Sequence, residues 1–477
     1  MSGLILVSHN LHQHSTLAAI YTAILSRRGG LWVSWDGEFH IATPDQRRPL
    51  TFQQGDKFDT LTFPLTRAEY EEGYHGYVHQ GLWPVFHQRP DLARFTHDSR
   101  RQYQQLNHAW ATAITEYAMP DDVIWVQDYH LIPCIKAVRD AGLLNRIGFF
   151  FHQPFPVGLH FEAIPEWQWL AESLLCCDVI GFQTQQDMNN FLSWIDSEFR
   201  TERLTANRFM IHGRIISTGV FPLGIDLDEA ICLSESNSCE FMAQQCQERL
   251  PVNTVLSGGH LDESAGLPYR ISAMEVLLRS HPHYAGNVTL LQLAAPAAGH
   301  PHRASTLTHQ LESLCGEMNG VHGTLEWYPV SCLNHQYSRE EQAGIYRASR
   351  VGVVTPLVSG MSLMAKMYVA LQDPADPGVL VLSRFAGAAE QMDGAILVNP
   401  YDPDAIADAI HTALQLPLRE RQKRHARLMK GLHRFDCHWW AESMIGRLID
   451  ADGHDAQPAS GLQRLYVAVA APGRVRY

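Results

Sequence analysis

The 477-residue sequence lacks the patterns that mark several protein classes. It has no apolar run of the length, about 18 residues or more, that crosses a bilayer. The apolar run at 4–8 is too short for a secretory signal and predicts a strand. Acidic residues outnumber basic ones, 50 to 37, and the net charge is −13. We therefore expect no nucleic-acid partner and no membrane partner.

Motifs of common hydrolases and kinases are also missing. There is no G-x-S-x-G, no P-loop and no H-E-x-x-H. The nine cysteines include no C-x-x-C pair, which favours buried free thiols and a cytoplasmic location. His9, His12 and His14 stand close together, but no cysteine or carboxylate accompanies them at ligand spacing. We interpret them as solvated loop residues and expect no metal.

Short apolar runs alternate with segments of helical periodicity along most of the chain. The first half has predicted strands at 4–8, 122–127, 146–152, 179–183 and 214–223. The second half has predicted strands at 254–258, 288–294, 324–328, 351–355, 379–383 and 395–398. Predicted helices include 16–26, 269–280, 304–318, 339–348, 362–372, 404–416, 419–432 and 437–449. Strands that each lead into a helix indicate an α/β protein with two parallel, Rossmann-like halves and a cleft between them.

The stretch 355–366 has the pattern of a strand, a glycine turn and the start of a helix. A helix N-terminus offers unpaired N–H groups that suit a phosphate. Gly360 would let the backbone approach a ligand closely, and Ser362 would cap the helix or contact an anion. Because many strand–helix turns hold no phosphate, the pattern alone favours a ligand site only moderately.

Polar and aromatic side chains follow several predicted strands. Asp128 and His152 each come directly after an apolar strand, at the sheet edge where ligands bind. They could grip sugar hydroxyls, or the aspartate could cap a helix and the histidine could lie in a core turn. Trp35, Tyr74 and Trp83 could stack on a sugar ring or pack under a loop.

Several longer motifs carry a resemblance to a known family. They are Gly29–Trp32, Leu82–Pro84, Asp128–Leu131, Asn145–Phe150, Ile180–Thr184, Gln372–Ser383 and Phe385–Ala389. The chain resembles, from about Leu4 to Ile449, the retaining trehalose-phosphate synthases of glycosyltransferase family 20, bacterial type. The resemblance implies a GT-B fold and transfer of glucose from UDP-glucose to glucose 6-phosphate without a metal or other cofactor. It also implies a homo-oligomer.

The resemblance implies a domain division as well. Residues 1–228 would form the acceptor domain, and 229–435 the nucleotide-sugar domain. Residues 436–455 would form a helix that crosses back to the first domain, and 456–477 a tail. The small-molecule partners would be a sugar or sugar phosphate and a nucleotide sugar.

Family site residues can be assigned to positions of this sequence by the resemblance. The retained ones are Asp128 and His152 around the transferred sugar, Trp35, Tyr74 and Trp83 on the acceptor side, and Gly360, Met361 and Leu363 in the phosphate turn. Other site positions are substituted: Asn10 and Ala298 replace acceptor-phosphate arginines, and His260 and Ala265 replace the diphosphate arginine and lysine. Ser359 replaces an aspartate of the phosphate turn, and Met367 the ribose-binding glutamate.

These substitutions leave three hypotheses open. The family reaction could persist with stand-in cations such as Arg303 or Lys366, or with the extra histidines. The donor or acceptor could have changed, since an acceptor without phosphate would account for Asn10 and Ala298. The chain could instead be a catalytically impaired paralogue that senses a sugar ligand or regulates an active partner. Each charge-assisted phosphate contact contributes roughly 1.5–3 kcal/mol, so the substituted residues themselves favour the third hypothesis.

Overall fold

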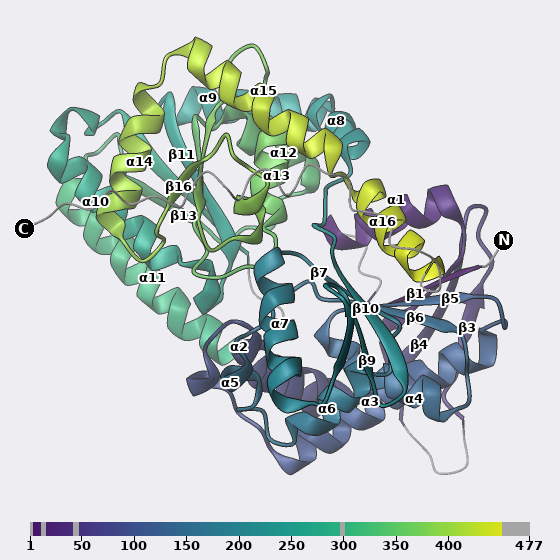
Figure 1. Cartoon of the computed structure of the whole chain (residues 1–477). Coiled ribbons are helices and arrows are strands. Elements are labelled where there is room, and N and C mark those ends of the chain that lie inside the picture. The colour runs from purple at the N-terminus through teal and green to yellow at the C-terminus, as the bar shows by residue number, and fades with distance from the viewer. Residues whose placement is uncertain (1–2, 11–15, 42–46, 296–300, 451–477) are drawn as a thin grey trace, which may run out of the picture.

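The computed structural model describes residues 3–10, 16–41, 47–295 and 301–450. Its strands form two separate sheets, each between layers of helices (Figure 1). The first sheet has ten strands in the order β3-β4-β2-β1-β5-β6-β7-β10-β9-β8. The second has six in the order β13-β12-β11-β14-β15-β16. This is the α/β architecture of two Rossmann-like units that the alternating pattern predicted.

The first sheet is parallel over its central strands. These are β2 (Leu31–Phe39), β4 (Asp59–Leu65), β1 (Leu4–Asn10), β5 (Val123–Gln127), β6 (Arg146–Phe150), β7 (Val179–Phe182) and β10 (Arg214–Val220). The edges are antiparallel and consist of β3 (Thr51–Gln53), β8 (Glu202–Thr205) and β9 (Arg208–Ile211). Strands β1, β5 and β6 therefore end side by side, which brings their following loops together.

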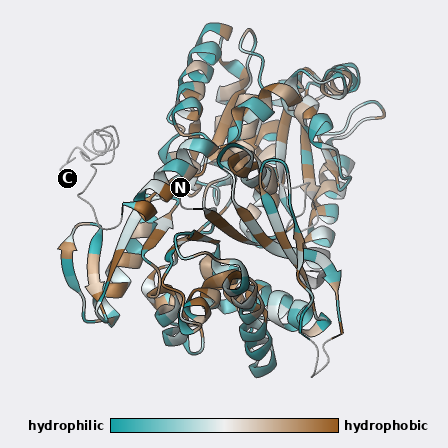
Figure 2. Cartoon of the chain, turned by 90° about the vertical axis from the view of Figure 1, so that its right-hand side faces the viewer, coloured by the Kyte–Doolittle hydropathy of each residue, from teal (hydrophilic) through white to brown (hydrophobic). Residues whose placement is uncertain are grey.

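The second sheet is parallel throughout. Its strands are β11 (Asn253–His260), β12 (Val288–Ala295), β13 (Val330–Leu333), β14 (Val351–Val354), β15 (Val379–Ser383) and β16 (Ile396–Val398). All residues of β14 and β15 are buried, as expected for strands covered by helices on both faces. Hydrophobic strands lie inside and polar helix faces outside (Figure 2).

Helices of the first half include α1 (Thr16–Arg28), a π-helical segment η1 (Glu69–Leu82), α2 (Trp83–Phe86), α3 (His97–Tyr117), α4 (Ile132–Asp140), α6 (Trp167–Leu174) and α7 (Gln185–Glu198). Those of the second half are α8 (Leu227–Ser234), α9 (Asn237–Arg249), α10 (Leu267–Ser280), α11 (Pro301–His322), α12 (Arg339–Ala348), α13 (Leu363–Ala370), α14 (Pro403–Gln415) and α15 (Leu418–Arg434). Among the described residues, no helix is both long and apolar enough to cross a membrane.

The final helix of the described chain, α16 (Cys437–Ile449), returns to the first sheet. It packs against α1 and strands β5, β6 and β7 (Figure 1). The Trp440 ring lies 4.6 Å from that of Trp125. The segment that enters α16 runs beside the segment that leaves β10. The Cys437 N–H donates to the Ile225 carbonyl at 3.1 Å, and a Cβ on Gly224 would lie 2.1 Å from the Phe435 carbonyl oxygen. The two connections between the sheets are therefore in backbone contact.

Two sequence predictions of local structure are wrong. Residues 324–328 form a turn instead of a strand, and the strand follows at Val330–Leu333. The indole of Trp327 donates to the Val288 carbonyl at 3.1 Å, so this apolar stretch contributes its ring to the core without joining the sheet. The strands β3 and β4, which precede Thr66, were not predicted.

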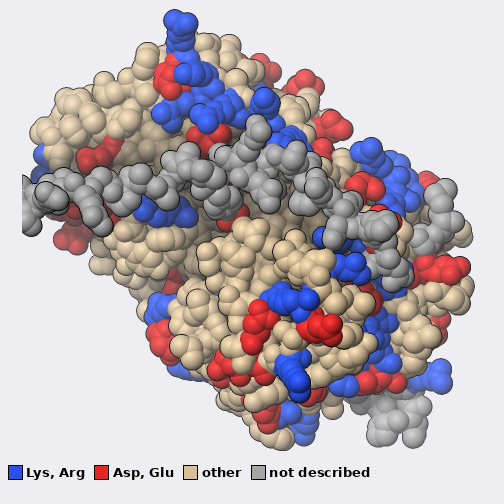
Figure 3. Space-filling model, in the orientation of Figure 1, with Lys and Arg blue, Asp and Glu red and all other residues tan. Residues whose placement is uncertain are grey.

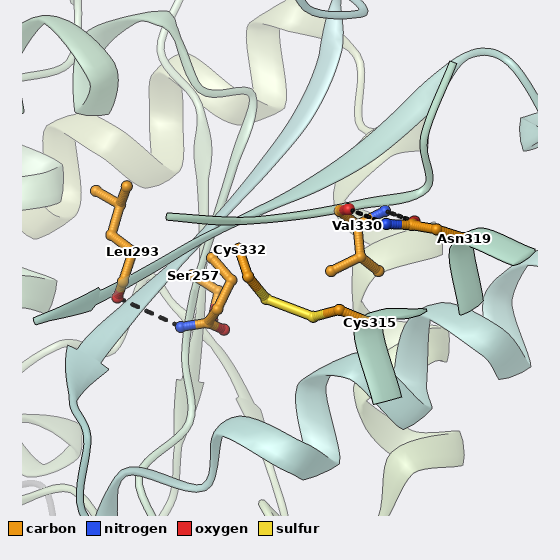
Figure 4. The surroundings of a disulfide bond; sticks show 7 residues. Ser257, Leu293, Cys315, Asn319, Val330 and Cys332 are labelled. Atoms are coloured by element: carbon orange, nitrogen blue, oxygen red, sulfur yellow. Dashed lines mark hydrogen bonds between the residues drawn. A yellow bond between two sulfur atoms is a disulfide. The ribbon is translucent and has the colours of Figure 1, made fainter. Parts of the chain in front are cut away.

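The prediction of free, buried cysteines is also wrong in part. Cys315 of α11 and Cys332 of β13 form a disulfide, with their Cα atoms 7.1 Å apart (Figure 4). The Asn319 amide lies beside it and donates to the Val330 carbonyl at 2.9 Å. Of the free cysteines, Cys134, Cys177, Cys239 and Cys437 are buried, Cys176 and Cys246 half-buried and Cys232 exposed.

The basic run at 419–427 lies on α15, as predicted, and its cations are visible over that helix in Figure 3. One of them is not solvated. Arg421 is buried and donates to Asp376 at 2.6 Å, whereas Arg427 is exposed and binds Asp393. The run therefore both covers the second sheet and faces solvent.

Candidate functional site

A cavity of about 120 Å³ lies in the first half, where β1, β5 and β6 end. It is lined by Ser8, His9, Leu17, Ala18, Tyr21, Tyr74, Gln127, Asp128, His130 and His152. Three of the residues that the sequence singled out, Tyr74, Asp128 and His152, are thus brought together. This edge of the sheet is where an open α/β fold places ligands.

Asp128 follows β5 with a left-handed backbone, at φ 67°. Its Oδ1 accepts hydrogen bonds from the N–H groups of Tyr129 at 3.0 Å and His152 at 3.2 Å. Burial raises the pKa of the Asp128 carboxyl to about 7, although these hydrogen bonds lower it. The alternative that the aspartate only caps the following 3-10 turn accounts for the bond from Tyr129 but not for the bond from His152 on the loop after β6.

His152 joins a polar cluster in the cavity. Its Nε2 lies 2.9 Å from Gln127 Oε1 and 3.0 Å from the Tyr21 hydroxyl. Burial lowers the pKa of His152 to about 3, so the ring is neutral near pH 7. The buried Gln127 Nε2 has no hydrogen-bond partner among the described residues. A neutral imidazole and a free amide are suited to bind hydroxyl groups.

Tyr74 is buried, and a neighbouring ring covers its face. The His9 ring stacks on it with centroids 3.7 Å apart and planes 8° from parallel. His130 lies on the same wall, and burial lowers its pKa to about 3. Its 3.7 Å approach to Asp128 is therefore no ion pair near neutral pH.

The other two predicted acceptor aromatics do not line this cavity. Trp35 is 5% exposed, donates to the Glu38 carbonyl at 2.8 Å and packs near the Tyr70 ring. Trp83 is 8% exposed and stacks on His87 with centroids 4.1 Å apart. For these two residues the structure matches the alternative we weighed, in which aromatic rings pack together.

The glycine turn of the second half contacts the backbone of the loop after β6. A Cβ on Gly360 would lie 2.0 Å from the His152 carbonyl oxygen. The turn is held by hydrogen bonds from Gly387 N–H to Ser359 and from Ala388 N–H to Met361. The candidate catalytic residue and the candidate donor turn are therefore in contact.

The start of α13 differs in part from the prediction. Ser362 precedes the helix with a left-handed backbone, and its side chain makes no capping hydrogen bond. Leu363 begins the helix and is half-buried, and Met361 is buried. Met367 is also buried in the core of the helix layer. No side chain of this group offers a charge to a phosphate or a carboxylate to a ribose.

The turn after β11 offers little fixed positive charge. His260 is exposed at the strand end, and Ala265 is buried. Between them the Asp262 carboxylate accepts from the N–H groups of Ser264 at 2.9 Å and Ala265 at 3.0 Å. Arg270 is buried behind the turn and binds Ser257, Gly258, Ala265 and Thr355. Its guanidinium therefore makes its hydrogen bonds within the protein and is not placed to bind a phosphate.

Lys366 and Arg303 were suggested by the sequence as possible replacements for the lost phosphate-binding cations. Where the structure describes them, they are not placed to bind a phosphate. Lys366 is buried and donates to the Leu223 carbonyl at 2.6 Å and to Gln391 at 2.8 Å. Asn10 ends β1 beside Trp35. Ala298, His12 and His14 lie outside the described residues, and the side chain of Arg303 is not described.

Sequence reasoning missed several residues of the cavity wall. Tyr21 lies within the helix predicted at 16–26, but its contact with His152 spans 131 positions and leaves no local signal. Gln127 is the last residue of a buried strand, and a polar residue there was a usable signal. The interpretation of His9 as a solvated loop residue is wrong, because His9 lies within β1 and is buried against Tyr74. His130 was not singled out.

Two Rossmann-like units, with polar side chains at the carboxyl ends of the strands of the first, have the architecture of the GT-B class of glycosyltransferases. The glycosyltransferase family 20 model matches residues 8–450. The trehalose-6-phosphate synthase of Enterobacter sp. (strain 638) is 39% identical over 429 residues, 90% of each chain. That of Citrobacter koseri is 38% identical over 441 residues, 92% of each chain. The chain belongs to glycosyltransferase family 20.

Solved structures agree with this assignment. An α,α-trehalose-phosphate synthase (UDP-forming) from Burkholderia xenovorans, in complex with glucose-6-phosphate, has a TM-score of 0.88 and 35% identity over 94% of this chain and 100% of its own. An E. coli structure bound with UDP-2-fluoro glucose has a TM-score of 0.89 and 38% identity over 94% of this chain and 99% of its own. The chain is a trehalose-6-phosphate synthase-like glycosyltransferase in sequence and fold.

Proposed function

We propose that this trehalose-6-phosphate synthase-like protein binds an uncharged sugar in the first-half cavity and has lost most of the synthase activity of its family. The observation that carries the proposal is the cavity wall. Among the described residues that line it there is no lysine or arginine, and burial keeps His130 and His152 neutral near pH 7. Neutral donors and acceptors suit hydroxyl groups, whereas a phosphate needs charge-assisted contacts.

The donor side supports the same proposal. UDP-glucose carries a diphosphate, whose departure requires cations or aligned N–H groups in the transition state. His260 and Ala265 stand where the resemblance places an arginine and a lysine, and the acidic Asp262 lies between them. A single lost oxyanion donor can lower a rate by about a hundredfold or more. The protein would thus act as a sugar sensor or as a regulatory partner of an active paralogue.

The second candidate is the family reaction itself, a retaining transfer of glucose from UDP-glucose to glucose 6-phosphate. The contact between Gly360 and His152 favours it, because it keeps the donor turn beside the transferred sugar. The resemblance implies no metal or other cofactor for this reaction. The substituted cations are the reason that we rank it second.

Calorimetric titration separates the two candidates. We expect glucose to bind with a dissociation constant in the millimolar range, glucose 6-phosphate to bind no better, and UDP to give no heat at millimolar concentration. His152→Ala should abolish the glucose heat, and His108→Ala, on an exposed face of α3, should leave it unchanged. Micromolar UDP binding with UDP release that depends on glucose 6-phosphate would establish the family reaction and overturn our first proposal.

The remaining partner and location assignments are proposals too. We propose a homo-oligomer or a complex with an active paralogue, in the cytoplasm. Support for the location comes from the seven free cysteines, whereas the Cys315–Cys332 disulfide is unusual there. Analytical ultracentrifugation, alone and after mixing with an active synthase, tests the assembly.

A further inference from the structure

A cluster of metal-ligating side chains lies where the two connections between the sheets touch, away from the sugar cavity. Asp226 stands on the connection that leaves the first sheet, and Cys437 and His438 begin α16, which returns to it. One ligand atom of each of the three lies within 4.8 Å of the others. We propose that Asp226, Cys437 and His438 bind one zinc ion that ties the two connections together.

The three side chains are available to a cation. Asp226 caps α8 through Oδ1, which accepts from the N–H groups of Asp228 at 3.0 Å and Glu229 at 3.2 Å. Oδ2 has no such role and can face an ion. The Cys437 thiol is free, and His438 is half-buried without a hydrogen-bond partner among the described residues. Thiolate, imidazole and carboxylate are the zinc ligands of proteins.

The charges around the thiol also favour a cation. The carboxylates of Asp226, Asp436 and Glu229 all lie near the Cys437 thiol. Glu229 is itself paired with Arg339, but Asp226 and Asp436 have no cationic partner among the described residues. On binding, the thiol releases its proton to solvent and its sulfur forms a bond to zinc. The zinc ion, one thiolate and one carboxylate sum to zero charge, which suits a buried position.

The geometry requires only local adjustment. Ligand atoms around a tetrahedral zinc lie about 3.5 Å apart, so small side-chain rotations would close the 4.8 Å cluster. The backbones are already fixed by the bond between Cys437 N–H and the Ile225 carbonyl. A cavity of about 590 Å³ between α1 and α8 is lined by Asp226 and Glu229, so solvent reaches the cluster from the Asp226 side.

This inference departs from the sequence prediction of no metal. That prediction concerned histidines near the first strand and the family reaction, and the ion proposed here would take no part in sugar transfer. Its effect would be to restrict the rotation of one sheet unit against the other, because both connections between them would be joined by metal bonds.

Titration of the full-length, chelator-treated protein with Co²⁺ and Zn²⁺ tests the proposal. We expect one Co²⁺ per chain with a thiolate-to-cobalt charge-transfer band, and displacement of Co²⁺ by one equivalent of Zn²⁺. Cys437→Ser should remove the band, and His438→Ala should weaken binding at least tenfold. Two matched controls are Cys232→Ser, at an exposed position of α8, and His433→Ala, at the exposed end of α15. Each should leave the charge-transfer band and the Co²⁺ affinity unchanged.

A second set of measurements covers the case in which Cys437→Ser fails to fold, since its side chain is buried. Asp226→Asn keeps a good helix cap but removes the charge, and should also weaken Co²⁺ binding at least tenfold. Zn²⁺ should raise the melting temperature of the wild-type protein and not that of His438→Ala. Absence of a thiolate band at one equivalent, or equal Co²⁺ affinity in wild type, Asp226→Asn and His438→Ala, would overturn the proposal.

Discussion

The Tyr21 hydroxyl lies 3.0 Å from His152 Nε2, so a residue of α1 fixes the ring that follows β6. Gln127 Oε1 lies 2.9 Å from the same nitrogen, and an Nε2–H shared between the two oxygens satisfies both contacts. The imidazole is thus oriented before any ligand arrives, which reduces the entropy cost of binding. This orientation makes Tyr21, which the sequence did not single out, the first residue to test.

Tyr21→Phe should reduce the affinity for glucose about threefold to tenfold, because a hydrogen bond of this kind contributes about 1 kcal/mol. The free energy of unfolding should fall by a similar amount. Calorimetry and urea denaturation measure the two effects. Tyr117→Phe, a half-buried tyrosine at the end of α3 that does not line the cavity, is the matched control. Unchanged affinity in Tyr21→Phe would show that the hydroxyl does not position His152 for binding.

Asp128 should make stability depend on pH. Its pKa is about 7 in the folded protein, against about 3.9 in an unfolded chain. Between these values the unfolded state has already released the proton, so the folded state loses stability as the pH rises from about 4 to about 7. The free energy of unfolding of wild type minus that of Asp128→Asn should therefore fall over this range, by on the order of 4 kcal/mol, and stay constant above it.

Denaturation curves at a series of pH values measure this difference. Asp121→Asn, an exposed neighbour on the turn before β5, should show no such trend. A flat difference between wild type and Asp128→Asn would mean that the carboxyl is not held in a raised-pKa environment.

Restoring the lost cations should restore donor binding. His260→Arg combined with Ala265→Lys should increase the affinity for UDP at least tenfold, since each charge-assisted phosphate contact contributes roughly 1.5–3 kcal/mol. Calorimetry with UDP measures the gain. The double change His283→Arg and Ala285→Lys adds the same charges at exposed positions and should have little effect. Equal gains in the two variants would mean that net charge alone attracts UDP.

Gly360→Ala tests the contact across the cleft. The new Cβ would lie 2.0 Å from the His152 carbonyl oxygen, which forces the turn and the first half apart. We expect a lower melting temperature and faster proteolysis of the connections between the sheets. Gly320→Ala in α11, where a Cβ meets nothing within 4 Å, should be neutral or slightly stabilising. Similar melting temperatures for the two variants would contradict the contact.

The sequence predicted the helices well where caps and periodicity agree. Both α12 and α16 have the predicted bounds, and Ser338 and Asp436 cap them. The prediction of a strand at 324–328 is wrong because only the Trp327 ring enters the core, where its indole N–H donates to the Val288 carbonyl, while the backbone forms a turn. The antiparallel edge strands β8 and β9 were missed since Glu202–Thr205 is mostly exposed and lacks an apolar run.

The candidate site was predictable to the extent that strand ends define it. Asp128 and His152 were found because β5 and β6 end at one sheet edge, and the structure places them in hydrogen-bond contact. The burial of Trp35 was not predictable, because Tyr70, which packs near it, comes from a distant segment. Trp83 stacks on His87, only four positions along the chain. The hydrogen bond from Lys366 to the Leu223 carbonyl was not predictable either, because the two residues are 143 positions apart.

The return of α16 to the first sheet affects how the protein is made. Strands β5, β6 and β7 leave the ribosome early, but the helix that covers them is the last of the described chain. Since synthesis proceeds at roughly 5–20 residues per second, the apolar face of these strands stays exposed for on the order of tens of seconds before α16 can pack on it. The first half therefore cannot complete its folding before α16 has been synthesised, and a nascent chain is open to chaperones until that point.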